Sequence, residues 1–133
     1  MTQTPHPTPQ TPPLWPPMPA DLRLAPHHVH IWQSPTDLPP ATLAYLTDLL
    51  SPDERQRLDR LRIPAKRTES LVARSLLRQI LGHLLQLDPR QLVFTPNPHG
   101  KPELAPLPSE HHQHIYFNVS HTPNRILLAV ALD

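Results

Sequence analysis

The longest run of regularly spaced apolar residues lies in the middle of the chain, from about Ala65 to Leu87. Large apolar residues recur there four positions apart, and a second apolar row lies beside the first. The two rows are Val72, Leu76, Ile80 and Leu84, and Ala73, Leu77, Leu81 and Leu85. This spacing puts both rows on one side of an α-helix, and it predicts a long helix whose apolar stripe forms the core.

Two shorter helices are predicted before the long one. Leucines at helical spacing between Ala41 and Leu50 predict the first. Ser51 is followed by Pro52 and then by two acidic residues, which is a typical helix start with a serine cap and proline at the first helical position. The second helix is therefore expected from Pro52 to about Leu61.

Short segments rich in β-branched and aromatic residues predict strands. They are Val29 to Trp32, Leu92 to Phe94, Ile115 to Val119 and Arg125 to Leu132. In the first of them, alternation places His28 and His30 on the face opposite Val29 and Ile31. His99 to Pro108 is expected to be a proline-rich loop. Strands packed on one long helix predict an α+β fold, with a small antiparallel sheet against the helix.

Proline changes this picture at the start of the chain, where eight of the 21 prolines fall within the first 19 residues. Proline lacks the N–H group that helices and sheet ladders need, so residues 1–25 are expected to be a disordered or polyproline-type leader. Leu14 and Trp15 within it could alternatively dock on a partner. Residues 26–133 are the expected folding unit.

The chain has no cysteine, which excludes disulfides and thiolate metal sites and fits a reducing cytoplasm. It has neither a secretory signal pattern nor an apolar run long enough to span a bilayer, so a cytoplasmic location without membrane contact is expected. The net charge is +1, although eight of the twelve Lys and Arg residues lie between Arg55 and Arg78. Near-neutral charge, interleaved acids and few aromatic residues argue against nucleic-acid binding.

Two short motifs could bind an anion. In Gly100-Lys101-Pro102, glycine allows a tight turn and lysine supplies a point charge suited to phosphate. Ser120-His121 offers a hydroxyl and an imidazole where the strand that ends at Val119 is expected to give way to a turn.

A basic band on the long helix borders its apolar stripe; it consists of Arg67, Ser70, Arg74 and Arg78, with Lys66 near its start. These side chains could reach an anion beside the sheet, or their aliphatic stems could cover apolar surface. Both interpretations are open from the pattern alone.

Histidines suggest another class of function. His111, His112 and His114, together with His28 and His30, could ligate zinc or nickel, which would make the chain a non-catalytic metal-binding or protein-interaction module. The first three lie in an expected loop that the metal would have to order, so no metal ligand is assigned.

The order of four motifs resembles the N-terminal half of the 4'-phosphopantetheinyl transferases of the surfactin-synthetase-activating type. The motifs are Leu50-Ser51-Pro52-Asp53-Glu54-Arg55, Leu71-Val72-Ala73-Arg74-Ser75-Leu76-Leu77-Arg78, Gly100-Lys101-Pro102 and Phe117-Asn118-Val119-Ser120-His121. The resemblance implies half of a fold made of two similar α/β halves related by a pseudo-twofold axis, with coenzyme A between them. It also implies transfer of phosphopantetheine from coenzyme A to a serine of an acyl or peptidyl carrier protein.

The resemblance assigns coenzyme A contacts to seven residues: Lys66, Arg67, Gly100, Lys101, Pro102, Ser120 and His121. The basic residues near the start of the long helix would hold the 3'-phosphate. Many relatives have a basic residue where this chain has Glu69, so which side chain holds that phosphate is left open.

The family also has an aspartate and a glutamate two positions apart that hold magnesium, followed later by a third carboxylate and a catalytic lysine. The 133 residues contain no Asp-x-Glu pair. The resemblance therefore implies that the catalytic residues and the C-terminal subdomain are absent, and that this chain alone binds coenzyme A at most. An uncovered apolar interface would then favour self-association or pairing with a separate C-terminal half.

Overall fold

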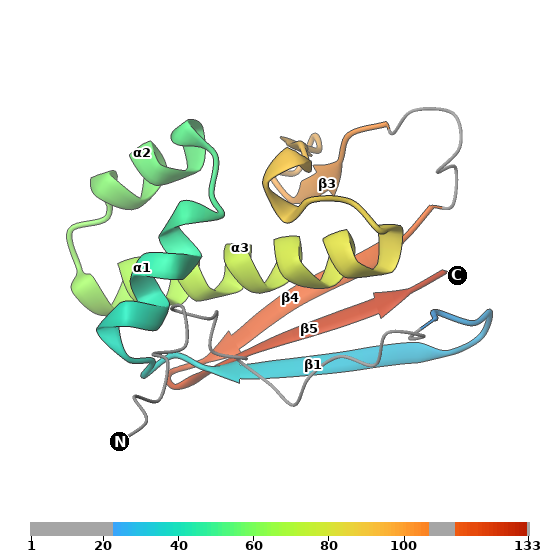
Figure 1. Ribbon diagram of the computed structural model, residues 1–133, viewed down its shortest axis with the longest axis horizontal. Coiled ribbons are helices and arrows are strands. Elements are labelled where there is room, and N and C mark those ends of the chain that lie inside the picture. The colour runs from blue at the N-terminus through green and yellow to red at the C-terminus, as the bar shows by residue number, and fades with distance from the viewer. Residues whose placement is uncertain (1–22, 107–113, 133) are drawn as a thin grey trace, which may run out of the picture.

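The computed structural model describes residues 23–106 and 114–132. A long helix lies along one face of a three-stranded antiparallel sheet, two shorter helices pack on that helix, and a two-stranded hairpin stands apart from the sheet (Figure 1). This is the α+β arrangement with a small antiparallel sheet on a long helix that the sequence predicts.

The helices form where apolar spacing and, for the second helix, the serine cap and proline start predict them. They are α1 (Pro40–Asp48), α2 (Pro52–Arg60) and α3 (Pro64–Leu85). Ser51 and Glu54 cap α2 reciprocally: Glu54 N donates to Ser51 Oγ at 3.2 Å, and Ser51 N donates to Glu54 Oε1 at 2.9 Å. The long helix α3 ends two residues before the expected Leu87, because Gln86 adopts a left-handed conformation with φ of 57°.

The sheet consists of β1 (Val29–Pro35), β4 (Tyr116–Thr122) and β5 (Arg125–Ala131) in the order β1-β5-β4. Its inner face carries the buried side chains of β5 and packs on α3. His30 lies on this inner face opposite Val130, so the predicted separation of His30 from Val29 and Ile31 is confirmed.

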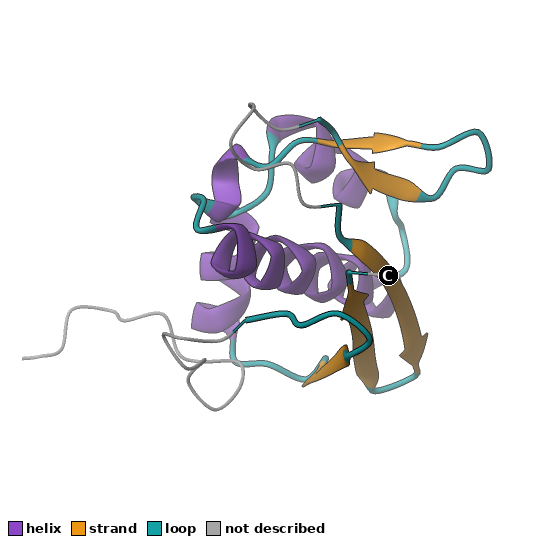
Figure 2. Cartoon of the chain, turned by 90° about the vertical axis from the view of Figure 1, so that its right-hand side faces the viewer, coloured by secondary structure: helices purple, strands orange, loops and turns teal. Residues whose placement is uncertain are grey.

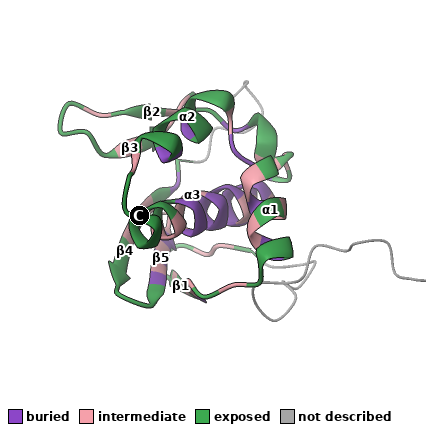
Figure 3. Cartoon of the chain, turned by 90° about the vertical axis from the view of Figure 1, so that its left-hand side faces the viewer, coloured by how far each residue is buried: buried purple, intermediate pink, exposed green. Residues whose placement is uncertain are grey.

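The outer face of the sheet is uncovered in the described part of the chain. Val29 is 58% exposed, Ile31 is 62% exposed and Tyr116 is 57% exposed. Burial is concentrated in α3, and further buried residues lie in β5 and in the two shorter helices (Figure 3). The buried apolar core comprises Leu46, Leu49, Leu50, Leu58, Leu71, Val72, Leu76, Leu77, Ile80, Leu81, Leu85, Leu92, Ile115, Ile126, Leu128 and Val130.

A hairpin of β2 (Phe94–Pro96) and β3 (Pro102–Leu104) follows a 3-10 turn, η1 (Pro89–Gln91), and stands to one side of the sheet (Figure 2). Two sequence predictions are wrong here. The strand expected from Leu92 starts at Phe94, because the Leu92 carbonyl accepts a hydrogen bond from Arg78 Nη1 instead of pairing in a ladder. The loop expected from His99 to Pro108 contains β3, since the short ladder places Pro102 opposite Pro96 at its end.

A third correction concerns β4, which runs to Thr122 where the sequence predicted an end at Val119. Ser120, His121 and Thr122 pair with the first residues of β5, and the turn comes at Pro123-Asn124. The sequence predicted a turn here because the three residues are polar. In the structure they are exposed residues at the end of an edge strand, where polar side chains are common. Residues 1–22, and His111 and His112 of the histidine-rich segment, lie outside the described residues.

Candidate functional site

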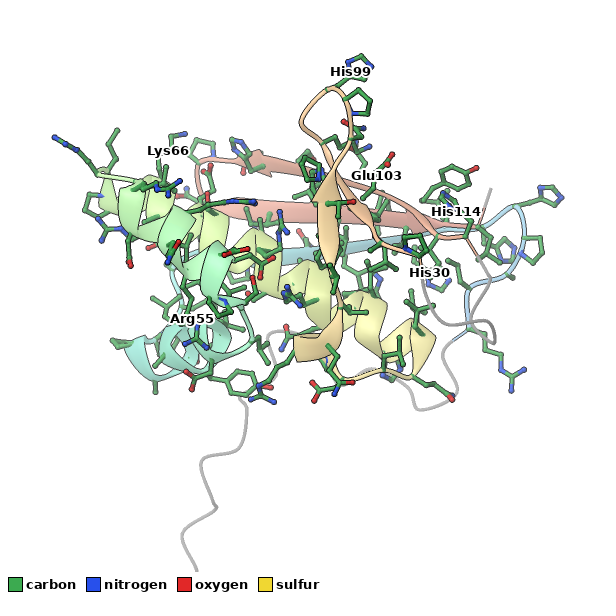
Figure 4. All side chains as sticks on the ribbon, turned by 90° about the horizontal axis from the view of Figure 1, so that it is seen from above. His30, Arg55, Lys66, His99, Glu103 and His114 are labelled. Carbon is green, nitrogen blue, oxygen red and sulfur yellow. The ribbon has the colours of Figure 1, made fainter. Side chains whose placement is uncertain are left out.

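Lys101 lies on the turn that joins β2 to β3, and Asn97 fixes this turn. The Asn97 side-chain oxygen accepts the backbone N–H of His99 at 2.8 Å and that of Lys101 at 2.9 Å. Gly100 takes a φ of 82°, which residues with a side chain rarely adopt. The turn projects from the body of the molecule with His99 at its tip, and the Lys101 residue is exposed (Figure 4).

Ser120 and His121 are neighbours in β4, and their side chains therefore lie on opposite faces of the sheet. Ser120 pairs with Leu127 on the outer face, and His121 pairs with Ile126 on the inner face, toward α3. The sequence predicted the two residues together at a turn; the strand separates their side chains instead.

His121 meets the first turns of α3 through Glu69. The Glu69 carboxylate oxygen Oε1 lies 3.3 Å from His121 Nδ1 and 3.8 Å from Lys66 Nζ. Two basic groups that the family resemblance assigns to coenzyme A thus contact one carboxylate. No sequence signal pointed to this contact, because Glu69 and His121 are distant in the chain.

Arg67 has a structural partner within the chain. Its Nε and Nη2 atoms donate to the Leu61 carbonyl at 3.1 and 2.9 Å, at the end of α2. A basic side chain near the last carbonyls of a helix stabilises that end. Two of its guanidinium nitrogens are therefore engaged at the α2–α3 junction.

The basic band on α3 faces the interior in its second half. The Arg78 side chain is 2% exposed; its Nη2 lies 2.8 Å from Glu54 Oε1, and its Nη1 donates to the carbonyls of Pro89 and Leu92, each at 2.8 Å. Arg74 lies 2.7 Å from the other Glu54 oxygen. Burial lowers the pKa of the Arg74 guanidinium, while Glu54 acts in the opposite direction. These two arginines stabilise the packing of α3 against α2 through Glu54. Neither interpretation of the band predicted an ion pair with Glu54.

Phe94 links the hairpin to the rest of the molecule. Its ring meets Phe117 of β4 edge to face, with ring centroids 6.1 Å apart. The guanidinium carbons of Arg74 and Arg78 lie 5.1 and 5.3 Å from its ring centroid. The base of the hairpin that carries Lys101 is thus fixed against both α3 and β4.

The basic candidate residues fall into two groups in space. Lys66 and His121 belong to one, at the start of α3 and the end of β4, and Lys101 belongs to the other, on the hairpin turn. Among the described residues, no hydrogen bond or ion pair joins the Lys101 side chain to the first group. A ligand with more than one anionic centre could contact both groups.

Within residues 23–106 and 114–132, no group of three or more carboxylates and histidines could hold a metal ion. The Glu54 carboxylate contacts two guanidinium groups, and the Glu69 carboxylate contacts Lys66 and His121. These residues do not fit a magnesium ion. None of the helices in this part of the chain combines the length and the hydrophobicity that a membrane span requires.

Comparisons with known proteins agree on one family. The family model described as "4'-phosphopantetheinyl transferase, N-terminal" matches residues 32–132. The 4'-phosphopantetheinyl transferase HetI of Nostoc sp. is 38% identical over 116 residues, which are 87% of this chain and 48% of the relative. The putative 4'-phosphopantetheinyl transferase slr0495 of Synechocystis sp. is 35% identical over 103 residues, which are 77% of this chain and 40% of the relative. The chain spans about half the length of these curated relatives or less.

A solved structure has a similar fold. Helicobacter pylori holo-[acyl-carrier-protein] synthase, crystallised in complex with coenzyme A, superposes with a TM-score of 0.56 at 16% identity. The match covers 78% of this chain and 98% of the other. At this identity the likeness is one of fold.

Proposed function

Because this chain belongs to the 4'-phosphopantetheinyl transferase family, we propose that it supplies the coenzyme A-binding side of an enzyme that modifies a carrier protein. The reaction would transfer phosphopantetheine from coenzyme A to a serine of an acyl or peptidyl carrier protein. The surfactin-synthetase-activating type and a cytoplasmic location are parts of this proposal.

The observation that carries the proposal is the placement of basic groups on two separate supports. Lys66 and His121 lie where α3 begins and β4 ends, and Lys101 lies on a turn whose base is fixed to both elements through Phe94. Coenzyme A carries a 3'-phosphate and a diphosphate, so it has an anionic centre for each of the two groups. Lysine and histidine suit phosphate as a point charge and as a ring N–H donor.

The transfer itself needs more than these contacts. The serine oxygen would bond to the phosphorus that carries pantetheine, the bond from that phosphorus to the bridging diphosphate oxygen would break, and adenosine 3',5'-bisphosphate would leave as the serine proton is lost. Negative charge builds on the phosphate oxygens in the transition state. Groups that bind the ground state and the transition state equally tightly do not lower this barrier.

We therefore propose that the 133 residues alone bind coenzyme A but transfer phosphopantetheine poorly, with no catalytic residue assigned among them. The sequence has no Asp-x-Glu pair, and the described carboxylates do not fit magnesium. The proposal includes association with a C-terminal half or with a second copy. The exposed apolar residues on the outer face of the sheet, such as Val29 and Ile31, support it.

Isothermal titration of the full chain with coenzyme A tests the binding. Binding is expected, and Lys101→Ala and His121→Ala should each weaken it by about tenfold, as loss of one charge-assisted contact to phosphate does. His28→Ala is the matched control, because His28 is exposed and precedes the opposite end of the sheet. A chain without measurable affinity, or an affinity that neither variant changes, would contradict the proposal.

Transfer is tested separately with magnesium, coenzyme A and an apo carrier protein, by the mass of the carrier. The expected result is little or no gain in mass. Efficient conversion would show that the 133 residues are sufficient for catalysis.

A further inference from the structure

The contact between Glu69 and His121 joins two elements at the candidate site. Glu69 lies in the second turn of α3, and His121 lies near the end of β4. The Glu69 side chain is 15% exposed, whereas the His121 side chain is 53% exposed. A largely buried carboxylate therefore holds a ring that is otherwise open to solvent.

The atom that Glu69 contacts is Nδ1 of the imidazole. A carboxylate has no proton to give at neutral pH, so at 3.3 Å it favours the tautomer that carries the proton on Nδ1. A proton on Nδ1 favours the ring orientation in which this nitrogen lies beside the carboxylate, and it leaves Nε2 as the nitrogen available to a ligand. Since His121 is half exposed, loss of the acceptor would let the ring sample other rotamers.

We propose that Glu69 is a positioning residue that sets the imidazole of His121, so that Nε2 is the ring atom presented to a phosphate oxygen of coenzyme A. This inference rests on the proposed function. In the sequence, Glu69 stands out only because many relatives have a basic residue at this position. The charge of Glu69 alone would not suggest a positioning role.

The charge of Glu69 acts against this role, because a carboxylate repels a polyanionic ligand. Lys66, whose ammonium group lies 3.8 Å from the same carboxylate oxygen, offsets part of that repulsion. A test must therefore separate the orientation of His121 from the charge of Glu69.

The variants Glu69→Gln and Glu69→Ala make this separation. Both remove the negative charge, but the glutamine amide oxygen can still accept from Nδ1–H and alanine cannot. In titrations of the full chain, the alanine variant is expected to bind coenzyme A about three- to tenfold more weakly than the glutamine variant, the size of one lost polar contact. Equal affinities of the two variants would overturn the inference.

The effect must pass through His121. In a His121→Ala background, the difference between the two Glu69 variants is expected to disappear. A difference that persists there would mean that Glu69 acts on the ligand directly, and it would overturn the positioning role.

Nitrogen-15 NMR of the imidazole supplies a readout that needs no ligand. At a pH where the ring is neutral, His121 should carry its proton on Nδ1 in the parent chain and in Glu69→Gln, and mainly on Nε2 in Glu69→Ala. Circular dichroism checks that both variants fold.

The titrations and the NMR measurement test the proposed function and the role of Glu69 separately. Absence of coenzyme A binding by the parent chain would overturn the proposed function, while the tautomer would still report whether Glu69 sets the ring. An unchanged tautomer across all three proteins would overturn the inference even if coenzyme A binds.

Discussion

Asn97 and Gly100 together determine where the Lys101 backbone lies. The Asn97 side chain replaces missing backbone partners on the inside of the turn, and Gly100 supplies the positive φ that closes it. Asn97 and Gly100 thus determine the position of Lys101, although only the lysine carries the charged group proposed to bind phosphate.

Gly100→Ala should destabilise this turn. An added Cβ would meet nothing within 4 Å, so the cost is purely conformational and amounts to about 1–2 kcal/mol for a left-handed alanine. We expect a lower free energy of unfolding in urea and weaker coenzyme A binding. Gly100→Asn is the matched control, because asparagine tolerates this conformation better, and its loss should be clearly smaller. Equal losses in the two variants would argue against the conformational explanation.

At the scale of single residues, the sequence predicts what depends on close neighbours. The tight turn at Gly100 and the serine cap of α2 are both local, and both are found. The contact of His121 with Glu69 and that of Arg78 with Glu54 depend on which elements pack together, and no short motif encodes them.

At the scale of elements, Glu54 and Arg78 join three segments. Glu54 caps α2, Arg78 comes from the middle of α3, and the carbonyls that Arg78 contacts belong to η1 and to the residue that follows it. Both charged side chains are nearly buried, so each depends on the other to offset the loss of water. The relative placement of α2, α3 and the base of the hairpin depends on this group.

Glu54→Gln should therefore be strongly destabilising. It leaves the Arg78 charge buried without its counter-charge, which costs about 3–5 kcal/mol, while glutamine can still complete the capping box. Asp53→Asn is the matched control: Asp53 is the adjacent, exposed residue in the same first turn, and its replacement should cost about 1 kcal/mol or less. Urea unfolding measures both, and similar losses would contradict the importance of the buried pair.

The three helices were predictable from the sequence because apolar spacing marks α1 and α3, and a serine cap with a proline start marks α2. The strands were less well defined because β2 and β3 have three residues each, too few to establish an alternating pattern. The end of β4 was missed for another reason: the pairing that extends it comes from β5, not from its own residues.

At the scale of the whole molecule, the two faces of the sheet differ in what covers them. The inner face packs on α3, whereas the outer face exposes apolar side chains in the described part of the chain. Ile126 and Ile31 are the same residue type on these two faces, fully buried in one case and 62% exposed in the other.

Replacement of each isoleucine by alanine should separate the two faces. Ile126→Ala removes buried methyl groups and leaves a cavity, at a cost of about 2–5 kcal/mol. Ile31→Ala lies on an edge strand and should cost about 1 kcal/mol or less, chiefly through lost β propensity. Thermal and urea unfolding measure the difference. A large loss for Ile31→Ala would show that the outer face is covered in solution, which sedimentation velocity can check.

The register of the sheet also constrains the order in which the molecule can fold. β5 is the central strand, and Ala131 pairs with both Val29 and Tyr116, so the last of these three strands to be made is the one that the other two need. During synthesis on the ribosome, α1, α2 and α3 can form from local contacts, but β1 has to wait for a partner about one hundred residues downstream. Until β5 emerges, the apolar stripe of α3 lacks its sheet, and exposed apolar surface of this kind makes a nascent chain prone to aggregation.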